Sequence, residues 1–78
     1  MSKATVFLNS IDKVKSFVNT ISHYSCDFDL ISGRYVIDAK SIMGIISLDL
    51  SKPLELEIHE DGEAATEIMD AIKDYIAE

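Results

Sequence analysis

The 78-residue sequence contains a single cysteine, a single proline, three glycines and no tryptophan. One cysteine cannot form an internal disulfide, which fits a protein of a reducing compartment, so we expect a cytoplasmic location. No apolar run approaches the roughly 18 residues that cross a membrane, and the N-terminus lacks a signal-peptide pattern. The sequence therefore predicts one soluble domain over residues 1–78, with no membrane segment.

Basic residues are also scarce. Seven lysines and arginines stand against 14 aspartates and glutamates, so the net charge is −7. Nucleic-acid binding needs clustered Lys and Arg for phosphate contacts, and no window here holds three basic residues together. We therefore expect proteins rather than nucleic acid as partners, although the acidity could also serve solubility alone.

Hydrophobic periodicity predicts seven elements in the order β-α-β-β-α-β-α. Ser10 or Asp12 can cap the first helix, and Gly33 suits a tight hairpin turn. Because the strands alternate apolar and polar residues, we expect an α+β open-faced β-sandwich. It would be a four-stranded, mainly antiparallel sheet with three helices on one face. The expected strands are 4–8, 26–30, 35–39 and 54–59, and the expected helices are 11–21, 42–48 and 65–76.

The second predicted helix begins behind Ser41, a natural N-cap, and is unusually apolar. Five of the residues in 42–48 are apolar, and a helix this short cannot turn all of them inward. We predict that Ile45 and Leu48 are core, leaving Ile42, Met43 and Ile46 at least partly exposed as a recognition surface. The alternative is that these residues are all core and that Ser41 is only a cap.

Residues 39–48 read AKSIMGIISL. This string resembles the regulatory-serine segment of HPr, the histidine-containing phosphocarrier protein of the bacterial sugar phosphotransferase system, and the predicted element order agrees with the HPr fold. The resemblance implies that Ser41 is a site of regulatory phosphorylation. It also implies that Lys40, Ile42, Met43 and Ile46 contact partner proteins. Those partners would be HPr kinase, a transcription regulator or phosphotransferase-system components.

The family's catalytic motif does not match. There, a histidine at the start of the first helix carries the phosphoryl group and is followed by alanine, arginine and proline. By this resemblance Asp12 occupies the histidine position, Val14 the arginine position and Lys15 the proline position. We therefore expect a divergent member without histidine phosphorelay and with no catalytic residue. Asp12 would be a helix cap, or alternatively an aspartyl phosphate acceptor, and His23 and His59 would be surface residues.

No metal or cofactor is predicted. His23, Cys26, Asp27 and Asp29 are close in sequence, but strand alternation turns Cys26 away from the two aspartates. Three functions stay open: a regulatory docking module, a phosphocarrier that uses a non-standard residue, and a scaffold that keeps only the fold. Whether the protein has enzymatic activity is uncertain on this basis, and nothing in the sequence indicates the oligomeric state.

Overall fold

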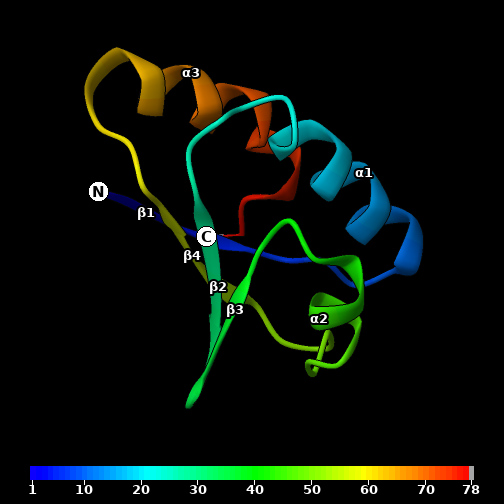
Figure 1. Ribbon diagram of the computed structural model, residues 1–78. Coiled ribbons are helices and arrows are strands. Elements are labelled where there is room, and N and C mark those ends of the chain that lie inside the picture. Colours follow the sequence, from blue (N-terminus) through cyan, green and yellow to red (C-terminus); the bar gives the residue numbers. More distant parts are fainter. Residues whose placement is uncertain (78) are drawn as a thin grey trace.

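The computed structural model describes residues 1–77 and shows an antiparallel sheet with the helices on one face (Figure 1). The sheet has four strands in the order β1-β4-β2-β3, and every neighbouring pair is antiparallel. The predicted fold class and element order are confirmed. The elements are β1 (Ser2–Val6), α1 (Ile11–Ile21), β2 (Phe28–Ser32), β3 (Tyr35–Asp38), α2 (Ile42–Ile46), β4 (Leu54–Ile58), α3 (Gly62–Ala71) and the 3₁₀ helix η1 (Lys73–Tyr75).

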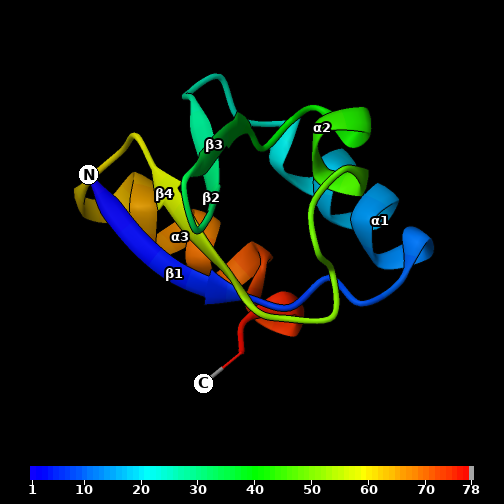
Figure 2. The ribbon, with the colours of Figure 1, turned by 90° about the horizontal axis from the view of Figure 1, so that it is seen from below.

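The alternation along β4 decides which face of the sheet is covered. Leu54, Leu56 and Ile58 are buried beneath the helices, whereas Glu55 and Glu57 face the other way. Figure 2 shows β1 and β4 running side by side, with α3 behind them and α1 and α2 to the right. The core therefore lies in one layer between the sheet and the helices, and the opposite face of the sheet is mainly polar, with Ile31 and Val36 as apolar exceptions.

Helix α1 is capped by Ser10, whose Oγ accepts a hydrogen bond from the N–H of Lys13 at 3.1 Å. Asp12 is the second residue of the helix, so the prediction that Asp12 is the cap is wrong. Its carboxylate still lies near the positive end of the helix dipole. The buried face of α1 consists of Val14, Phe17, Val18 and Ile21.

Several predicted boundaries shift, and strand pairing explains the shifts of β1 and β2. β1 starts and ends two residues earlier than expected because it pairs with β4 from Ser2↔Ile58 to Val6↔Leu54. β2 starts two residues later, at Phe28, which pairs with Ile58. Cys26, predicted to lie within this strand, therefore precedes it and is half-buried.

The predicted last helix divides into two parts. α3 ends at Ala71, and the following turn is η1. Beyond it, Ile76 forms a bridge with Val6, and the N–H of Ala77 donates to the carbonyl of Thr5 at 2.8 Å. The final residues leave the helix because they pair along the outer side of β1.

The cap assignment makes a prediction about stability. Ser10→Ala should lower the free energy of unfolding by about 1 kcal/mol, because it leaves one helix N–H without its acceptor. Asp12→Asn should lower it by roughly 0.3–0.5 kcal/mol, because only a dipole interaction is lost. Urea unfolding monitored by circular dichroism measures both changes. An Asp12→Asn variant that lost more stability than Ser10→Ala would contradict the assignment.

Candidate functional site at Ser41 and helix α2

Ser41 is the exposed N-cap of α2. Its Oγ accepts a hydrogen bond from the N–H of Gly44 at 3.1 Å, and its own N–H donates to the carbonyl of Asp38 at 3.0 Å. The first bond caps the helix, and the second attaches the helix start to the end of β3. The hydroxyl is consequently held in one place while remaining open to solvent.

The five residues of α2 divide between core and surface as predicted. Ile45 is fully buried and Ile42 is half-buried against the core, whereas Met43 is 77% exposed and Ile46 is 38% exposed. Just past the helix, Leu48 is half-buried against the same core. Met43 and Ile46 therefore present apolar side chains to solvent next to the Ser41 hydroxyl.

Gly44 has a steric reason to be glycine. A Cβ at this position would lie 3.2 Å from Ser41 Oγ and 3.3 Å from Ile37 Cδ1, closer than ordinary van der Waals contact. Glycine lowers helix propensity by about 1 kcal/mol relative to alanine. Here it lets α2 approach β3 closely and leaves room for the capping hydroxyl.

Lys40 has an intramolecular role that sequence reasoning missed. Its Nζ donates to the carbonyls of Tyr24 at 2.6 Å and Cys26 at 3.0 Å, and it lies 5.5 Å from the centroid of the Phe28 ring. This ammonium group ties the segment after α1 to the start of α2. No local sequence pattern reveals the contact, because the partners are 14 and 16 residues away.

The start of α1 carries no imidazole. The sequence has no histidine among residues 1–22. His23 is exposed just past the opposite end of α1, and His59 follows β4, where its Nε2 lies 2.7 Å from Asp29 Oδ2. Both histidines are surface residues, as predicted. Within residues 1–77, no three His, Cys, Asp or Glu side chains come together as a metal site.

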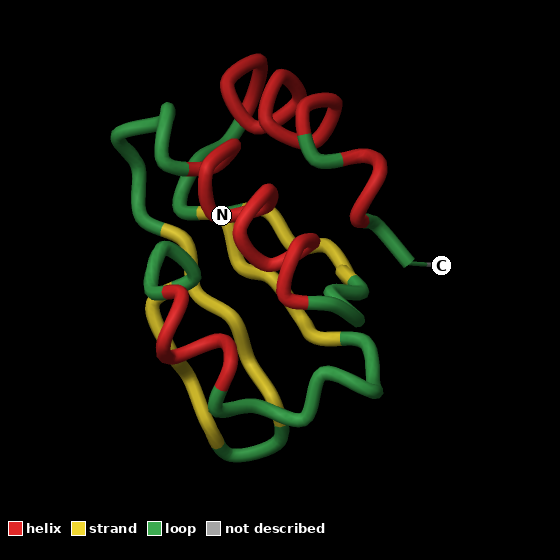
Figure 3. The backbone as a smooth tube through the Cα atoms, turned by 90° about the vertical axis from the view of Figure 1, so that its right-hand side faces the viewer, coloured by secondary structure: helices red, strands yellow, loops and turns green. Residues whose placement is uncertain are grey.

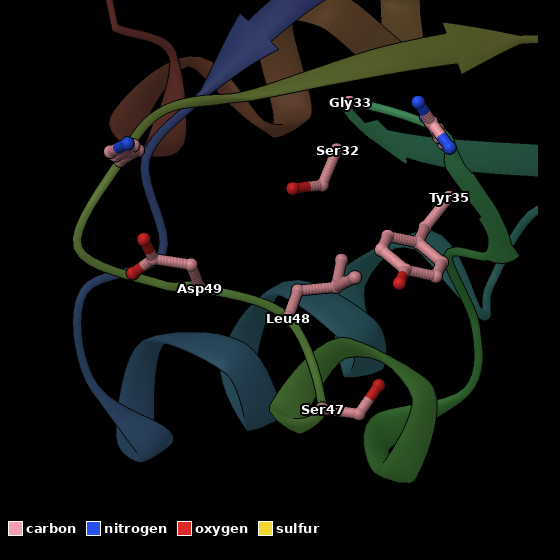
Figure 4. Close-up of a pocket in the computed structure, with 8 residues that line it drawn as sticks. Ser32, Gly33, Tyr35, Ser47, Leu48 and Asp49 are labelled. Carbon is pink, nitrogen blue, oxygen red and sulfur yellow. The ribbon is translucent and has the colours of Figure 1, made fainter.

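A shallow hollow of about 380 Å³ lies beside α2, between the β2–β3 turn and the chain after the helix. Figure 4 shows the Ser32 hydroxyl and the Leu48 side chain on its walls. Asp49, also on the wall, accepts hydrogen bonds from the hydroxyl and the N–H of Ser51, and these bonds lower the pKa of its carboxyl. These hydrogen bonds stabilise the folded chain fully at pH values above the pKa that the Asp49 carboxyl has in the unfolded chain. The stabilisation is lost as the pH falls through the lower pKa of the folded chain.

The chain is similar to known proteins over most of its length. A family model described as the phosphotransferase-system HPr component phosphorylation site matches residues 13–78. Among solved structures, "HPr-C-His" from Thermoanaerobacter tengcongensis is 28% identical, with a TM-score of 0.75. The match covers 95% of this chain and 89% of that one.

Two more distant structures share the fold. The phosphocarrier protein HPr of Bacillus anthracis is 21% identical, with a TM-score of 0.69; the match covers 97% of this chain and 96% of that one. The Bacillus subtilis catabolite repression protein Crh is also 21% identical, with a TM-score of 0.62 and coverage of 96% and 88%. It is described as an intertwined dimer with a swapped domain.

The Lys40 geometry predicts a cost in stability when the ammonium is removed. Lys40→Met keeps most of the aliphatic length but leaves two carbonyls without their charged donor, so the free energy of unfolding should fall by about 1.5–3 kcal/mol. Lys52→Met, at an exposed position, should change it by less than about 0.5 kcal/mol. Chemical denaturation measures both. Equal stability of the two variants would show that the Lys40 contacts contribute nothing.

Proposed function

The chain belongs to the HPr family of the sugar phosphotransferase system, and we propose that within it the protein is a regulatory docking module without histidine phosphorelay. The single observation that carries this proposal is the pairing of an exposed Ser41 hydroxyl with exposed Met43 on a helix that Ile45 and Ile42 attach to the core. The docking contacts come from Ile42, Met43 and Ile46, with Lys40 positioning the helix start.

The start of the first helix supports the proposal that this protein does not relay phosphoryl groups through a histidine. A phosphohistidine requires an imidazole at this helix end, and residues 1–22 contain none. Asp12 is exposed, and aspartyl phosphates ordinarily form where a bound metal supports the carboxylate. Within residues 1–77 no such cluster accompanies it. Asp12 therefore contributes to helix stability rather than to group transfer.

The docking face is small but suited to protein contact. Met43 is exposed to 77%, and its flexible thioether adapts to the shape of a partner. Ile46 extends the apolar area, and Ile45 anchors the helix beneath it. Because Gly44 allows close packing on Ile37, the exposed side chains stand on a rigid base. A rigid base reduces the ordering cost that binding would otherwise incur.

Phosphorylation of Ser41 would control this face by charge. A phosphate adds about −1.5 to −2 units of charge at neutral pH beside the apolar side chains. The adjacent Lys40 ammonium keeps its charge but is held in place by two backbone carbonyls. The chain already carries −7. The modified face would therefore repel acidic partners and recruit basic ones.

Purified HPr kinase from the source organism tests both the serine and the docking face. Wild-type protein should gain one phosphate, and Ser41→Ala should gain none. Met43→Asp should lower kcat/KM at least about tenfold, because a charge placed in a contact patch commonly costs more than 1.4 kcal/mol.

Ala64→Asp is the matched control, since it adds the same charge on an exposed position of α3 and should react at the wild-type rate. Intact-mass spectrometry follows the reaction. Phosphorylation of Ser41→Ala, or equal rates for Met43→Asp and wild type, would count against the proposal.

Incubation with enzyme I and labelled phosphoenolpyruvate tests the absence of relay. We expect no label on this chain, whereas a histidine-containing HPr in the same mixture should be labelled. An acid-labile phosphohistidine or a hydroxylamine-sensitive acyl phosphate on this protein would instead identify a phosphocarrier that uses a non-standard residue.

A further inference from the structure

The two outer edges of the sheet differ. The edge of β1 is covered at its C-terminal end, because the N–H of Phe7 donates to the carbonyl of Tyr75 and the N–H of Ala77 donates to that of Thr5, both at 2.8 Å. Within residues 1–77, β3 pairs on one side only, with β2. Figure 3 shows this hairpin as two strands joined by a tight turn at one side of the sheet. The β3 edge is therefore the more open of the two.

The hydrogen-bond pattern identifies the backbone groups at this edge. The N–H of Ala39 donates to the carbonyl of Phe28 at 2.9 Å, which makes 28↔39 a bonded pair in the β2–β3 register. Bonded and non-bonded pairs alternate along an antiparallel ladder. Tyr35 and Ile37 therefore bond inward to β2, whereas the N–H and C=O of Val36 point outward. The Asp38 carbonyl, which points the same way, already accepts from Ser41.

Strand β3 carries neither lysine nor proline, although its length of four residues limits pairing. Exposed strand edges are commonly blocked by lysine, proline or a bulge. Here Tyr35 is 69% exposed and Val36 is 60% exposed. Arg34, the only arginine in the sequence, occupies the hairpin turn and forms no ion pair within residues 1–77. An apolar edge flanked by an unpaired positive charge suits a strand that carries a negative charge.

We propose that the occupant is a second copy of this chain, paired antiparallel through β3 about a two-fold axis at Val36. The two Val36 residues would exchange N–H···O=C bonds across the axis. On the helix-covered face, Tyr35 of each copy would lie opposite Ile37 of the other. Arg34 of each copy would lie beside Asp38 of the other, so two complementary charge pairs would flank the apolar centre.

The self-complementarity selects this register over its neighbours. The outward-pointing N–H and C=O groups of one copy must meet those of the other. The two neighbouring symmetric registers therefore have the two-fold axis at Tyr35 or at Ile37. An axis at Tyr35 places Arg34 against Val36, and an axis at Ile37 places Val36 against Asp38. Each shift sets a charged side chain opposite an apolar one. The Val36 axis instead places apolar side chains opposite apolar ones and Arg34 opposite Asp38.

The pairing would be weak and reversible. β3 has only four residues, so the contact falls in the size class of transient encounters, below about 1,200 Å². Both copies keep their own β1 and C-terminal segments in place, so no part of the chain is exchanged.

Sedimentation velocity over a range of protein concentrations tests the edge. We expect the average mass of the wild-type protein to rise with concentration. Val36→Pro should abolish the rise because it removes the outward N–H, and proline is tolerated at a strand edge. Val36→Thr, which keeps that N–H and the branched shape, should preserve it. Far-UV circular dichroism and urea unfolding establish that both variants fold.

A mixed sample of labelled and unlabelled protein tests the register by NMR. An intermolecular NOE is expected between the Hα of Tyr35 and the Hα of Ile37, because directly opposite residues of a non-bonded antiparallel pair approach to about 4.5 Å between Cα atoms. Arg34→Glu should weaken the association, and Arg34→Glu with Asp38→Arg should restore it. A monomer at every concentration, an association that survives Val36→Pro, or a dimer without this NOE would overturn the proposal.

Discussion

Strand β4 is the constraint on which the rest of the structure depends. It lies inside the sheet; all five of its residues pair with β1 on one side, and four of them pair with β2 on the other. Its inward side chains Leu54, Leu56 and Ile58 are 0–2% exposed and form the floor on which the helices pack. Because both neighbours take their register from this strand, β4 fixes the positions of the α1 start and, through the β2–β3 hairpin, of α2.

Much of this architecture could be predicted from the sequence, since the determining signals are local. The alternation of 54–58 predicts β4, and the helical spacing from Ile11 to Ile21 predicts α1. Ser41 and the apolar residues after it predict a capped helix with one buried face. These signals act between residues two to four positions apart, and tertiary structure does not override them here.

The misses have one common cause, which is contact between distant parts of the chain. β1 includes the polar residues Ser2 and Lys3 because β4 offers them partners more than 50 residues away. The residues next to Lys40 in the sequence indicate an ordinary surface lysine. Its ammonium group nevertheless donates hydrogen bonds to carbonyls 14 and 16 residues earlier. The choice between Ser10 and Asp12 as the cap likewise depended on backbone geometry that composition does not specify.

The pairing of Thr5 and Phe7 with the residues around Ile76 also bears on how the chain folds. These contacts close a loop of about 70 residues, and the sheet order β1-β4-β2-β3 adds a second long closure. Closing large loops before their contacts form slows folding. The β2–β3 hairpin, with its two-residue turn, needs no such closure and is suited to form first. The edge strand of the finished sheet would then be the earliest to appear, and β1 among the last to be locked in place.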